Sequence, residues 1–250
     1  MVNIEQDKSR YGLVGKNISY SFSKGYFTQK FARMGLEGYS YGNFDLQDIQ
    51  DFPGILEDTP NLKGLNVTIP YKEAVIPFLN RLEGPAKEIG AVNTIAFRGS
   101  ERIGHNTDIF GFQSSLEPLL TGQHRGGLIL GTGGASKAVA YVLERLGLPF
   151  RQVSRNPKTG QMHYTEIDGD TLEEFNIVIN CTPLGTFPHV DQKPYLPYPL
   201  LGPGHLLYDL IYNPSKTAFL LAGEAQGASI QNGLPMLELQ AEKAWEIWTR

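Results

Sequence analysis

The sequence has 250 residues, 41% of them hydrophobic and 19% charged, which suits one large or two ordinary domains with a packed core. Its 22 Lys and Arg against 26 Asp and Glu give a net charge of −4, which argues against a broad basic surface for nucleic acid. The first residues lack an apolar signal segment, and no stretch approaches the ~18 apolar residues of a membrane span. The single cysteine, Cys181, excludes an intrachain disulfide. We therefore expect a cytoplasmic protein without a metal site.

In the first half of the chain, apolar segments of strand length alternate with segments of helical periodicity. The pattern predicts strands over residues 11–15, 39–45, 62–68, 91–98 and 101–105. It predicts helices over 23–35, over 46–56 with an interruption at Pro53, from about Tyr71, and around 85–90. Such alternation favours an α/β fold with a largely parallel sheet.

The pattern restarts after a helix that begins near residue 107. Predicted strands cover 126–131, 150–154, 176–180, 205–210 and 228–230, and predicted helices cover 135–147, 216–227 and 234–249. We therefore expect a second α/β unit from about residue 107. By this pattern alone the closing helix fits either half.

A glycine-rich turn joins the first strand and helix of this second unit, in LILGTGGASKAV. Gly131 permits a tight turn, Gly133 lets the backbone approach a pyrophosphate, and the following helix offers free N–H groups to the anion. Ser136 replaces the third glycine of the usual pattern, and a glycine-rich turn without a ligand is the alternative. The apolar strand before the turn and the amphipathic helix after it favour dinucleotide binding.

The next strand ends in Ser154-Arg155-Asn156, where NAD sites usually carry an Asp or Glu for the ribose hydroxyl. A guanidinium and two small polar side chains suit a 2′-phosphate instead, because a phosphate needs charge-assisted donors. An exposed loop arginine is the alternative. We predict NADP(H) as the cofactor.

Polar clusters follow probable strand ends in the first half, at 17–25, 66–72, 91–94 and 104–108. Each has a structural explanation, such as a helix cap at Ser21 or Ser23. Lys72 lies just past a strand that carries Asn66 and Thr68 on one side. Because ligands of open α/β sheets bind at strand ends, the clusters together suggest a site for a polyhydroxylated acid.

At this point the sequence resembles a known family. NVTIPYKEAV, AVNTI, GHNTDIFGF, LGTGGASKAV, INCTPLGT, DLIYNPSKTAFL and NGLPMLELQAEKAWEIW are similar, in order, to the signature blocks of shikimate dehydrogenases, from about residue 11 to the C-terminus. The resemblance implies NADP-dependent, reversible reduction of 3-dehydroshikimate to shikimate, a step of chorismate and aromatic amino acid biosynthesis. It implies an α/β fold in which an N-terminal α/β substrate domain (1–106 and 232–250) and a Rossmann-like, doubly wound NADP-binding domain (107–231) face each other across a cleft, with the last helix returning to the first domain.

The resemblance also implies the site residues. The catalytic lysine falls on Lys72 and its partner on Asp108. Substrate contacts fall on Ser21, Ser23, Asn66, Thr68, Lys72, Asn93, Asp108, Tyr212 and Gln240. Cofactor contacts fall on Gly131, Thr132, Gly133, Gly134, Ala135, Ser136, Ser154, Arg155, Asn156, Thr182, Leu210 and Gly233. We expect a small-molecule substrate, no nucleic-acid or membrane partner, and a monomer or homodimer.

The chain departs from the family in its first block, where Asn17, Tyr20 and Lys24 replace Pro, His and Pro. These changes leave the shape of the loop and the identity of the acid open. A quinate/shikimate dehydrogenase paralogue, a non-catalytic NADP-binding regulator and a methylene-tetrahydrofolate dehydrogenase-like enzyme are the alternatives. We interpret His105 as a hydrogen-bonded loop residue rather than a base, and Cys181 as a buried residue rather than a nucleophile.

Overall fold

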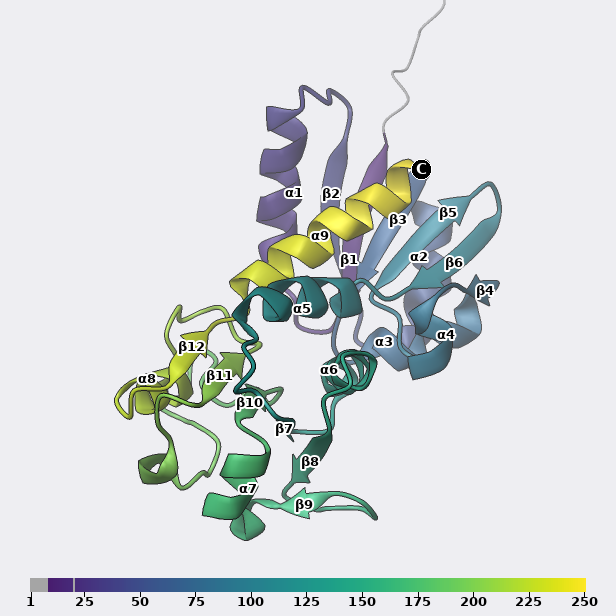
Figure 1. The fold of residues 1–250 in the computed structure, drawn as a ribbon. Coiled ribbons are helices and arrows are strands. Elements are labelled where there is room, and N and C mark those ends of the chain that lie inside the picture. The colour runs from purple at the N-terminus through teal and green to yellow at the C-terminus, as the bar shows by residue number, and fades with distance from the viewer. Residues whose placement is uncertain (1–8, 20) are drawn as a thin grey trace, which may run out of the picture. The chain divides into compact units, whose positions relative to one another are not determined.

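The computed structural model describes residues 9–19 and 21–250, so Tyr20 and the first eight residues lie outside the described part (Figure 1). The chain forms two compact units. Unit 1 is made of Met1–Thr107, as far as it is described, and Ala241–Arg250, and unit 2 of Asp108–Gln240. Among the described residues, no helix combines the length and the apolar character needed to cross a membrane.

Unit 1 is built on a mixed sheet with the strand order β2-β1-β3-β5-β6-β4. Its strands are β1 (Arg10–Gly15), β2 (Ser40–Asp45), β3 (Leu62–Val67), β4 (Arg81–Leu82), β5 (Thr94–Arg98) and β6 (Glu101–His105). β1 pairs in parallel with β2 and β3, whereas β5 runs antiparallel to both β3 and β6. The helices are α1 (Phe22–Arg33), α2 (Phe52–Asp58), α3 (Tyr71–Ala74) and α4 (Pro85–Ile89), with short 3-10 turns at Ile49–Asp51 and Ile76–Phe78.

Helices cover both faces of this sheet. On one face, Phe27 and Phe31 of α1 pack with Tyr11, Tyr41 and the last turns of α9 (Leu234–Thr249) in one aromatic core, and Figure 1 shows these two helices beside each other. On the other face, α2, α3 and α4 pack over β1, β3 and β5. The C-terminal end of α9 is anchored because Trp248 Nε1 donates to the Ile95 carbonyl oxygen at 3.0 Å. Trp248 is thus a buried residue of the unit 1 core.

Unit 2 is a parallel sheet with the order β12-β11-β10-β7-β8-β9. Counted along the unit from β7, this is the doubly wound order in which the chain starts at the centre, moves out to one edge, and returns to the centre before it moves to the other edge. The strands are β7 (Gly127–Leu130), β8 (Phe150–Ser154), β9 (Met162–His163), β10 (Ile177–Asn180), β11 (Leu206–Asp209) and β12 (Ser229–Gln231). The structure therefore confirms a Rossmann-like second unit.

The helices of unit 2 are α5 (Asp108–Leu116), α6 (Gly134–Arg145), α7 (Gly169–Glu174), α8 (Ala218–Glu224) and the start of α9, with 3-10 turns at Glu117–Leu119, Tyr164–Glu166 and Tyr198–Leu200. α7 and α8 pack on the face of the sheet that carries Leu128, Val178 and Leu207. Tyr208 alternates to the opposite face, where its hydroxyl lies 2.6 Å from Ser115 Oγ of α5.

Two predictions about elements are corrected by the structure, and some short elements were missed. Pro53 does not interrupt a helix; it lies in the first turn of α2, where its missing N–H would have no partner within the helix. The strand expected from residue 91 begins only at Thr94, because the Val92 N–H donates to the Lys72 carbonyl oxygen instead. α7 and β9 were not predicted, since elements of six and two residues are too short to show periodicity.

Candidate active site

The polar segments of unit 1 meet at one edge of its sheet. β1 and β3 are parallel, and β6 runs in the same direction because both β3 and β6 are antiparallel to β5. Their carboxyl ends therefore lie at the same edge as the amino end of β5. This arrangement brings together the described residues after β1 (17–19 and 21–23), the segment after β3 (68–72), Asn93, and the residues after β6 (106–107).

Asn93 is the centre of a buried hydrogen-bond network at this edge. Its Oδ1 accepts from the Thr107 backbone N–H at 2.7 Å, and its Nδ2 donates to Thr107 Oγ1 at 3.0 Å. The backbone donor determines the orientation of the amide, because only the oxygen can accept from an N–H. Asn66 Nδ2 donates to the Asn93 carbonyl oxygen at 3.3 Å and to Thr94 Oγ1 at 3.2 Å. Two predicted substrate contacts, Asn66 and Asn93, are thus held together in one network.

Tyr41 extends the network and was not predicted as a site residue. Its hydroxyl donates to Asn66 Oδ1 at 2.8 Å, in the buried interior of unit 1. Burial raises the pKa of Tyr41 far above its ordinary value, and a hydrogen bond with Ser23 opposes that shift. In the sequence, Tyr41 is one aromatic residue in a predicted strand, so nothing distinguished its hydroxyl from that of a surface tyrosine.

The loop that carries Ser21 has a turn of its own. Asn17 adopts the left-handed conformation with φ 57°, and Asp45 accepts from the Asn17 and Ile18 N–H groups at 2.8 and 3.1 Å. A proline, which the resemblance leads us to expect here, has φ fixed at about −65° and cannot adopt this turn. Ser21 caps α1, since its Oγ accepts from the Lys24 N–H at 3.3 Å. The departure from the family therefore changes the backbone just before the two serines; Tyr20 lies outside the described residues.

Lys72 is the second residue of the short helix α3 and is half-buried. The helix is attached to the sheet at both sides: Tyr71 N–H donates to the Thr68 carbonyl oxygen at 2.9 Å, and the Lys72 carbonyl oxygen accepts from Val92 N–H at 2.7 Å. Pro70 lies in the turn between β3 and α3. Two backbone contacts thus define the position of Lys72, because a four-residue helix is not stable without tertiary contacts.

Asp108 and Gln240 belong to unit 2 and are both buried. Asp108 begins α5, and Gln240 lies on α9, where its Nε2 donates to the Leu237 carbonyl oxygen at 2.9 Å. The two helices approach closely at Gly111, because a Cβ there would lie 2.5 Å from the Met236 carbonyl oxygen. Tyr212 follows β11 and is half-buried. The pairing of Lys72 with Asp108 joins residues of different units and stays a prediction.

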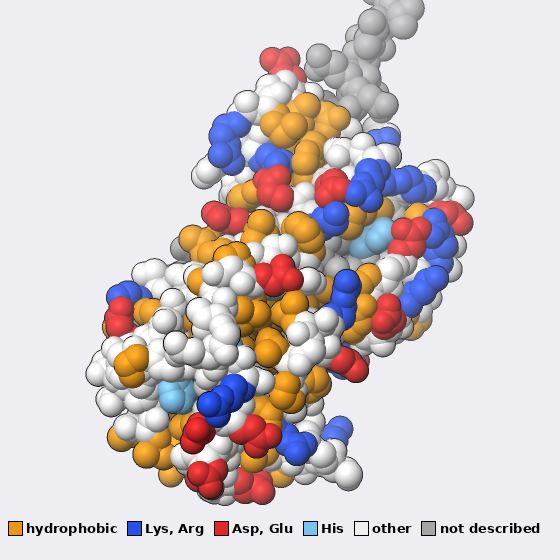
Figure 2. Space-filling model, in the orientation of Figure 1, with side chains coloured by type: hydrophobic (Ala, Val, Ile, Leu, Met, Phe, Trp, Pro, Cys, Tyr) orange, Lys and Arg blue, Asp and Glu red, His pale blue; other side chains and the backbone are white. Residues whose placement is uncertain are grey.

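His105 ends β6, and its Nε2 lies 3.9 Å from a carboxylate oxygen of Glu83. Burial lowers the pKa of His105, and Glu83 partly opposes this. Glu83 also pairs with Arg81, and Figure 2 shows acidic and basic side chains intermingled over the part of unit 1 that carries β4 and β6. These contacts support the interpretation of His105 as a structural residue. Burial also raises the pKa of the Cys181 thiol, which is unfavourable for a nucleophile.

The glycine loop of unit 2 turns sharply between β7 and α6. Gly131 has φ 103°, and a Cβ there would lie 3.1 Å from Thr182 Cγ2, so the chain itself demands glycine. Gly133 has an ordinary φ of −78°, and a Cβ there would meet no atom of the described chain within 4 Å. The space above Gly133 is thus open to a ligand at the amino end of α6, where N–H groups favour an anion. Thr132, Gly134 and Ala135 complete the loop.

Ser136 stands at the position of the third glycine of the usual pattern. It is fully buried, and its Oγ donates to the Gly133 carbonyl oxygen at 2.6 Å. The hydroxyl therefore holds the loop in shape. A contact from Ser136 to the cofactor stays a prediction.

Arg155 lies beside this loop. β7 and β8 are adjacent, and Gly131 N–H donates to the Val153 carbonyl oxygen at 2.9 Å, so the end of β8 lies next to the glycine turn. Ser154 Oγ accepts from the Asn156 N–H at 3.2 Å and shapes the turn that carries Arg155. Arg155 and Asn156 are exposed. An exposed guanidinium at this place fits the 2′-phosphate of NADP(H).

A second buried network lies at the carboxyl ends of β10 and β11. The Asp209 carboxylate accepts from Asn180 Nδ2 at 3.0 Å, from Ile211 N–H at 3.0 Å and from Thr217 Oγ1 at 2.5 Å. Burial raises the pKa of Asp209 to about 6, and the hydrogen bonds oppose that shift. Asn180 Oδ1 accepts from the N–H and the hydroxyl of Thr182 at 3.0 and 2.7 Å.

Two further predicted cofactor contacts adjoin this network. Leu210 N–H donates to the Asn180 carbonyl oxygen at 3.1 Å, and a Cβ at Gly233 would overlap the Leu210 carbonyl oxygen. Sequence reasoning missed Asn180, Asp209 and Thr217. The available signal was a polar residue at the end of each of two apolar strands.

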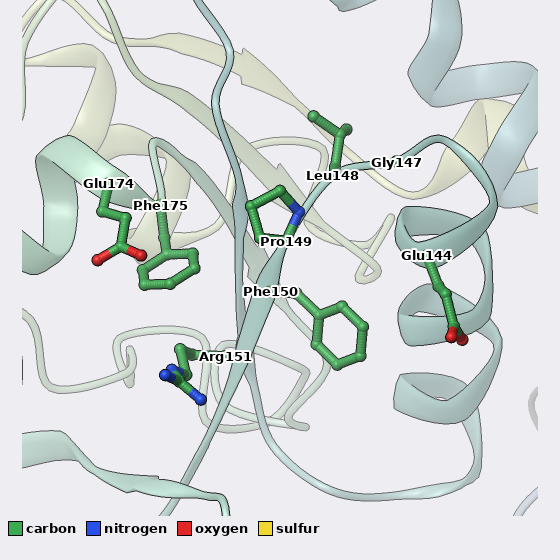
Figure 3. Close-up of a pocket in the computed structure, with 8 residues that line it drawn as sticks. All are labelled: Glu144, Gly147, Leu148, Pro149, Phe150, Arg151, Glu174 and Phe175. Carbon is green, nitrogen blue, oxygen red and sulfur yellow. The ribbon is translucent and has the colours of Figure 1, made fainter.

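A surface hollow of about 570 Å³ lies at the other end of the unit 2 strands (Figure 3). Its lining comes from the end of α6, the start of β8 and the end of α7, and includes Glu144, Pro149, Phe150 and Phe175. It therefore lies at the amino ends of the strands, whereas ligands of such sheets bind at the carboxyl ends. The hollow has no part in the candidate site.

Comparisons with known proteins identify related chains. A family model described as the shikimate dehydrogenase substrate binding domain matches residues 13–95. A shikimate dehydrogenase (NADP(+)) from Desulforamulus reducens is 35% identical over 261 residues, which cover 95% of this chain and 89% of the relative.

Solved structures show the same fold. The shikimate dehydrogenase from Aquifex aeolicus has a TM-score of 0.86 at 30% identity, over 98% of this chain and 94% of that chain. The shikimate 5-dehydrogenase from Thermus thermophilus, solved in complex with NADP(H) and shikimate, has a TM-score of 0.85 at 30% identity, over 96% of this chain and 93% of that chain. With relatives of this identity spanning nearly its whole length, the chain belongs to the shikimate dehydrogenase family.

Proposed function

We propose that this chain catalyses the reversible, NADPH-dependent reduction of 3-dehydroshikimate to shikimate, a step of chorismate and aromatic amino acid biosynthesis. The observation that carries the proposal is the match to an NADP(+) shikimate dehydrogenase over 95% of the chain. The chemistry needs a polar substrate edge with a lysine and a nucleotide loop with a phosphate-binding cation. Unit 1 carries the first and unit 2 the second.

The proposal assigns residues 1–106 and 232–250 to the substrate domain and 107–231 to the dinucleotide-binding domain. The buried amides of unit 1 and the open glycine loop of unit 2 support this division. The substrate is a small molecule. A cytoplasmic, monomeric or homodimeric chain without nucleic-acid or membrane partners remains our expectation.

The substrate residues divide by the groups they offer. Ser21 and Ser23 offer hydroxyls to the substrate carboxylate, and Tyr212 is assigned to the same carboxylate. Asn93 offers amide donors in an orientation that Thr107 determines. Asn66, Thr68, Lys72, Asp108 and Gln240 contact the ring hydroxyls and the reacting oxygen. Such a set of fixed donors and acceptors discriminates strongly against acids that lack a hydroxyl, because a buried polar group would lose its partner.

The cofactor residues follow the edge of the unit 2 sheet. The loop 131–136 and the amino end of α6 hold the pyrophosphate, and Ser154, Arg155 and Asn156 hold the 2′-phosphate. Thr182, Leu210 and Gly233 lie on the other side of the loop, beside β10 and β11. When bound, NADP(H) supplies or accepts the hydride.

Lys72 handles the proton in this mechanism. Its ammonium donates to the ketone oxygen as reduction develops negative charge there, and its amine takes the proton back in oxidation. In this assignment the Asp108 carboxylate is the partner of Lys72 and orients the neighbouring substrate hydroxyl. The two backbone contacts of α3 keep the lysine in place for this transfer.

An absorbance assay of nicotinamide reduction tests the proposal, with shikimate and quinate each combined with NADP and NAD. We expect the highest kcat/KM for shikimate with NADP. A higher kcat/KM for quinate would identify the paralogue instead. No turnover in all four combinations, with NADPH still bound, would identify the non-catalytic regulator and refute the enzyme.

A further inference from the structure

The mechanism above does not use Asp209, although this carboxylate is fully buried. A buried carboxylate is costly unless it is hydrogen-bonded, and Asp209 accepts from Asn180, Ile211 and Thr217. These groups come from three different segments: the end of β10, the loop after β11 and the cap of α8. One carboxylate therefore joins three segments at the carboxyl edge of the sheet.

The strand order indicates which half of the cofactor this edge supports. β7, which carries the glycine loop, lies between β8 on one side and β10 and β11 on the other. A dinucleotide crosses such an edge with its pyrophosphate at the central loop. Because Arg155 follows β8, the adenosine half lies on the β8 side. The nicotinamide half then lies over the ends of β10 and β11, where the Asp209 network is.

The network also reaches the backbone that would contact the ring. Thr182 is fixed by Asn180, and its methyl group packs against Gly131 of the glycine loop. On the other side, Ile211 N–H is fixed by Asp209, and Gly233 packs against the neighbouring Leu210 backbone. A change in the direction of the Asp209 bonds would move both segments at once.

We propose that Asp209 is a positioning residue for the nicotinamide half of NADP(H): it sets the Thr182 and Leu210 segments relative to the glycine loop and so places the ring for hydride transfer. This inference rests on the proposed function for the identity of the cofactor. A misplacement of about 1 Å at the reacting atoms lowers kcat by up to about a hundredfold, so a residue that touches neither reactant can have a large kinetic effect.

The opposite edge of the same sheet offers a matched control. Asn176 accepts from the Arg125 N–H at 2.9 Å and donates to the carbonyl oxygens of Gln123 and Gly204 at 2.9 and 3.0 Å. It thereby joins the segments before β7, β10 and β11 at their amino ends, as Asp209 joins segments at the carboxyl ends. If the Asp209 network had only a structural role, Asn176→Asp and Asp209→Asn should have the same effects on NADPH binding and kcat.

The experiment compares whole cofactor with its adenosine half. For Asp209→Asn and Asn176→Asp, the dissociation constants of NADPH and of 2′,5′-ADP are measured by calorimetry, together with kcat and Tm. We expect Asp209→Asn to weaken NADPH binding about tenfold, to leave 2′,5′-ADP binding within about twofold, and to lower kcat at least about tenfold. Asn176→Asp lowers Tm without a selective loss of NADPH.

A second pair of variants keeps the test decisive where Asp209→Asn does not fold. Thr217→Val removes one donor to Asp209 with little change in volume, and Thr217→Ser retains the hydroxyl. We expect Thr217→Val to weaken NADPH binding selectively, but less than Asp209→Asn does. Thr217→Ser should restore the wild-type dissociation constant of NADPH.

Two results would overturn the inference: equal weakening of NADPH and 2′,5′-ADP in the Asp209 or Thr217→Val variants, or the same selective loss in Asn176→Asp. A wild-type chain that binds NADPH without oxidising shikimate contradicts the proposed substrate alone, and the two dissociation constants still decide the role of Asp209. A wild-type chain that does not bind NADPH contradicts both.

Discussion

The two units bury polar groups at their site edges in different ways. In unit 1 the network of Tyr41, Asn66, Asn93 and Thr107 consists of neutral hydroxyls and amides. In unit 2 the network is centred on a carboxylate, Asp209. Neutral groups keep their hydrogen bonds across the ordinary pH range, whereas a buried carboxylate accepts stronger bonds, which weaken when it is protonated.

This difference suits the roles that we propose. The network at the substrate edge consists of amides and hydroxyls that keep their charge state, so in the proposed reaction charge changes on Lys72 and the reacting oxygen and not on the groups that hold the substrate. The cofactor edge holds backbone segments, and a carboxylate that accepts from several donors fixes their relative positions more firmly than an amide would. The following predictions test each side of the comparison, from the largest expected effect to the smallest.

The charge of Lys72 is the first target, because the neutral network of unit 1 cannot replace it. We expect Lys72→Ala to lower kcat by about 10² to 10⁴, the usual contribution of a general acid, with a much smaller rise in the KM for shikimate. Lys63→Ala, an exposed lysine of the same unit, is the control and keeps wild-type kinetics. Equal kcat values for Lys72→Ala and wild type would remove its catalytic role.

The carboxylate of unit 2 should give stability a pH dependence. The pKa of Asp209 is raised from 3.8 to about 6, so the folded chain binds the proton more tightly than the unfolded chain. The stability contributed by this proton is therefore fully present below about pH 4 and is lost as the pH rises through about 6. The loss amounts to ~3 kcal/mol, at ~1.4 kcal/mol per pKa unit.

This prediction is checked by urea unfolding of wild type and Asp209→Asn at about pH 4 and about pH 7. The free energy of unfolding of wild type, relative to that of the variant, should decrease from about pH 4 to about pH 7, because the amide of the variant does not titrate in this range. A constant difference would mean that Asp209 keeps its ordinary pKa.

The cation at the end of β8 is expected to select the cofactor. We expect Arg155→Ala to lower the preference for NADP over NAD about ten- to a hundredfold, since a charge-assisted hydrogen bond contributes ~1.5–3 kcal/mol. The measurement is kcat/KM for both cofactors at saturating shikimate. Arg151→Ala, an exposed arginine near the amino end of the same strand, should leave the ratio unchanged. An unchanged ratio in Arg155→Ala would refute the phosphate assignment.

The smallest effect concerns the neutral network. Tyr41→Phe removes the hydroxyl that donates to Asn66 and keeps the aromatic packing, so it should cost about 1 kcal/mol of unfolding free energy. It should also raise the KM for shikimate without changing the KM for NADP. Because the network is neutral, the stability loss should be the same at about pH 5 and about pH 8, in contrast to Asp209→Asn. Tyr11→Phe, in the same aromatic core, controls for the loss of a tyrosine hydroxyl there; a larger KM effect from Tyr11→Phe would separate Tyr41 from the site.

Much of the fold and part of the site followed from the sequence alone. Local patterns were sufficient for the strand and helix alternation, for the turn at Gly131, and for the cap at Ser21, because each depends on residues only a few positions apart. The resemblance of the motif blocks added the family, and the comparisons confirmed it.

Only the tertiary structure decided which side chains share a network. Tyr41 and Asn66 are 25 positions apart, and Asn180 and Asp209 are 29 apart, so their contacts exist only once the strands have paired. It also decided the turn at Asn17, whose φ of 57° depends on Asp45 from a different strand. The sequence by itself determined the local elements and the motif residues, whereas the partners that orient them required packing, because hydrogen bonds between distant segments leave no periodic or local signal in the chain.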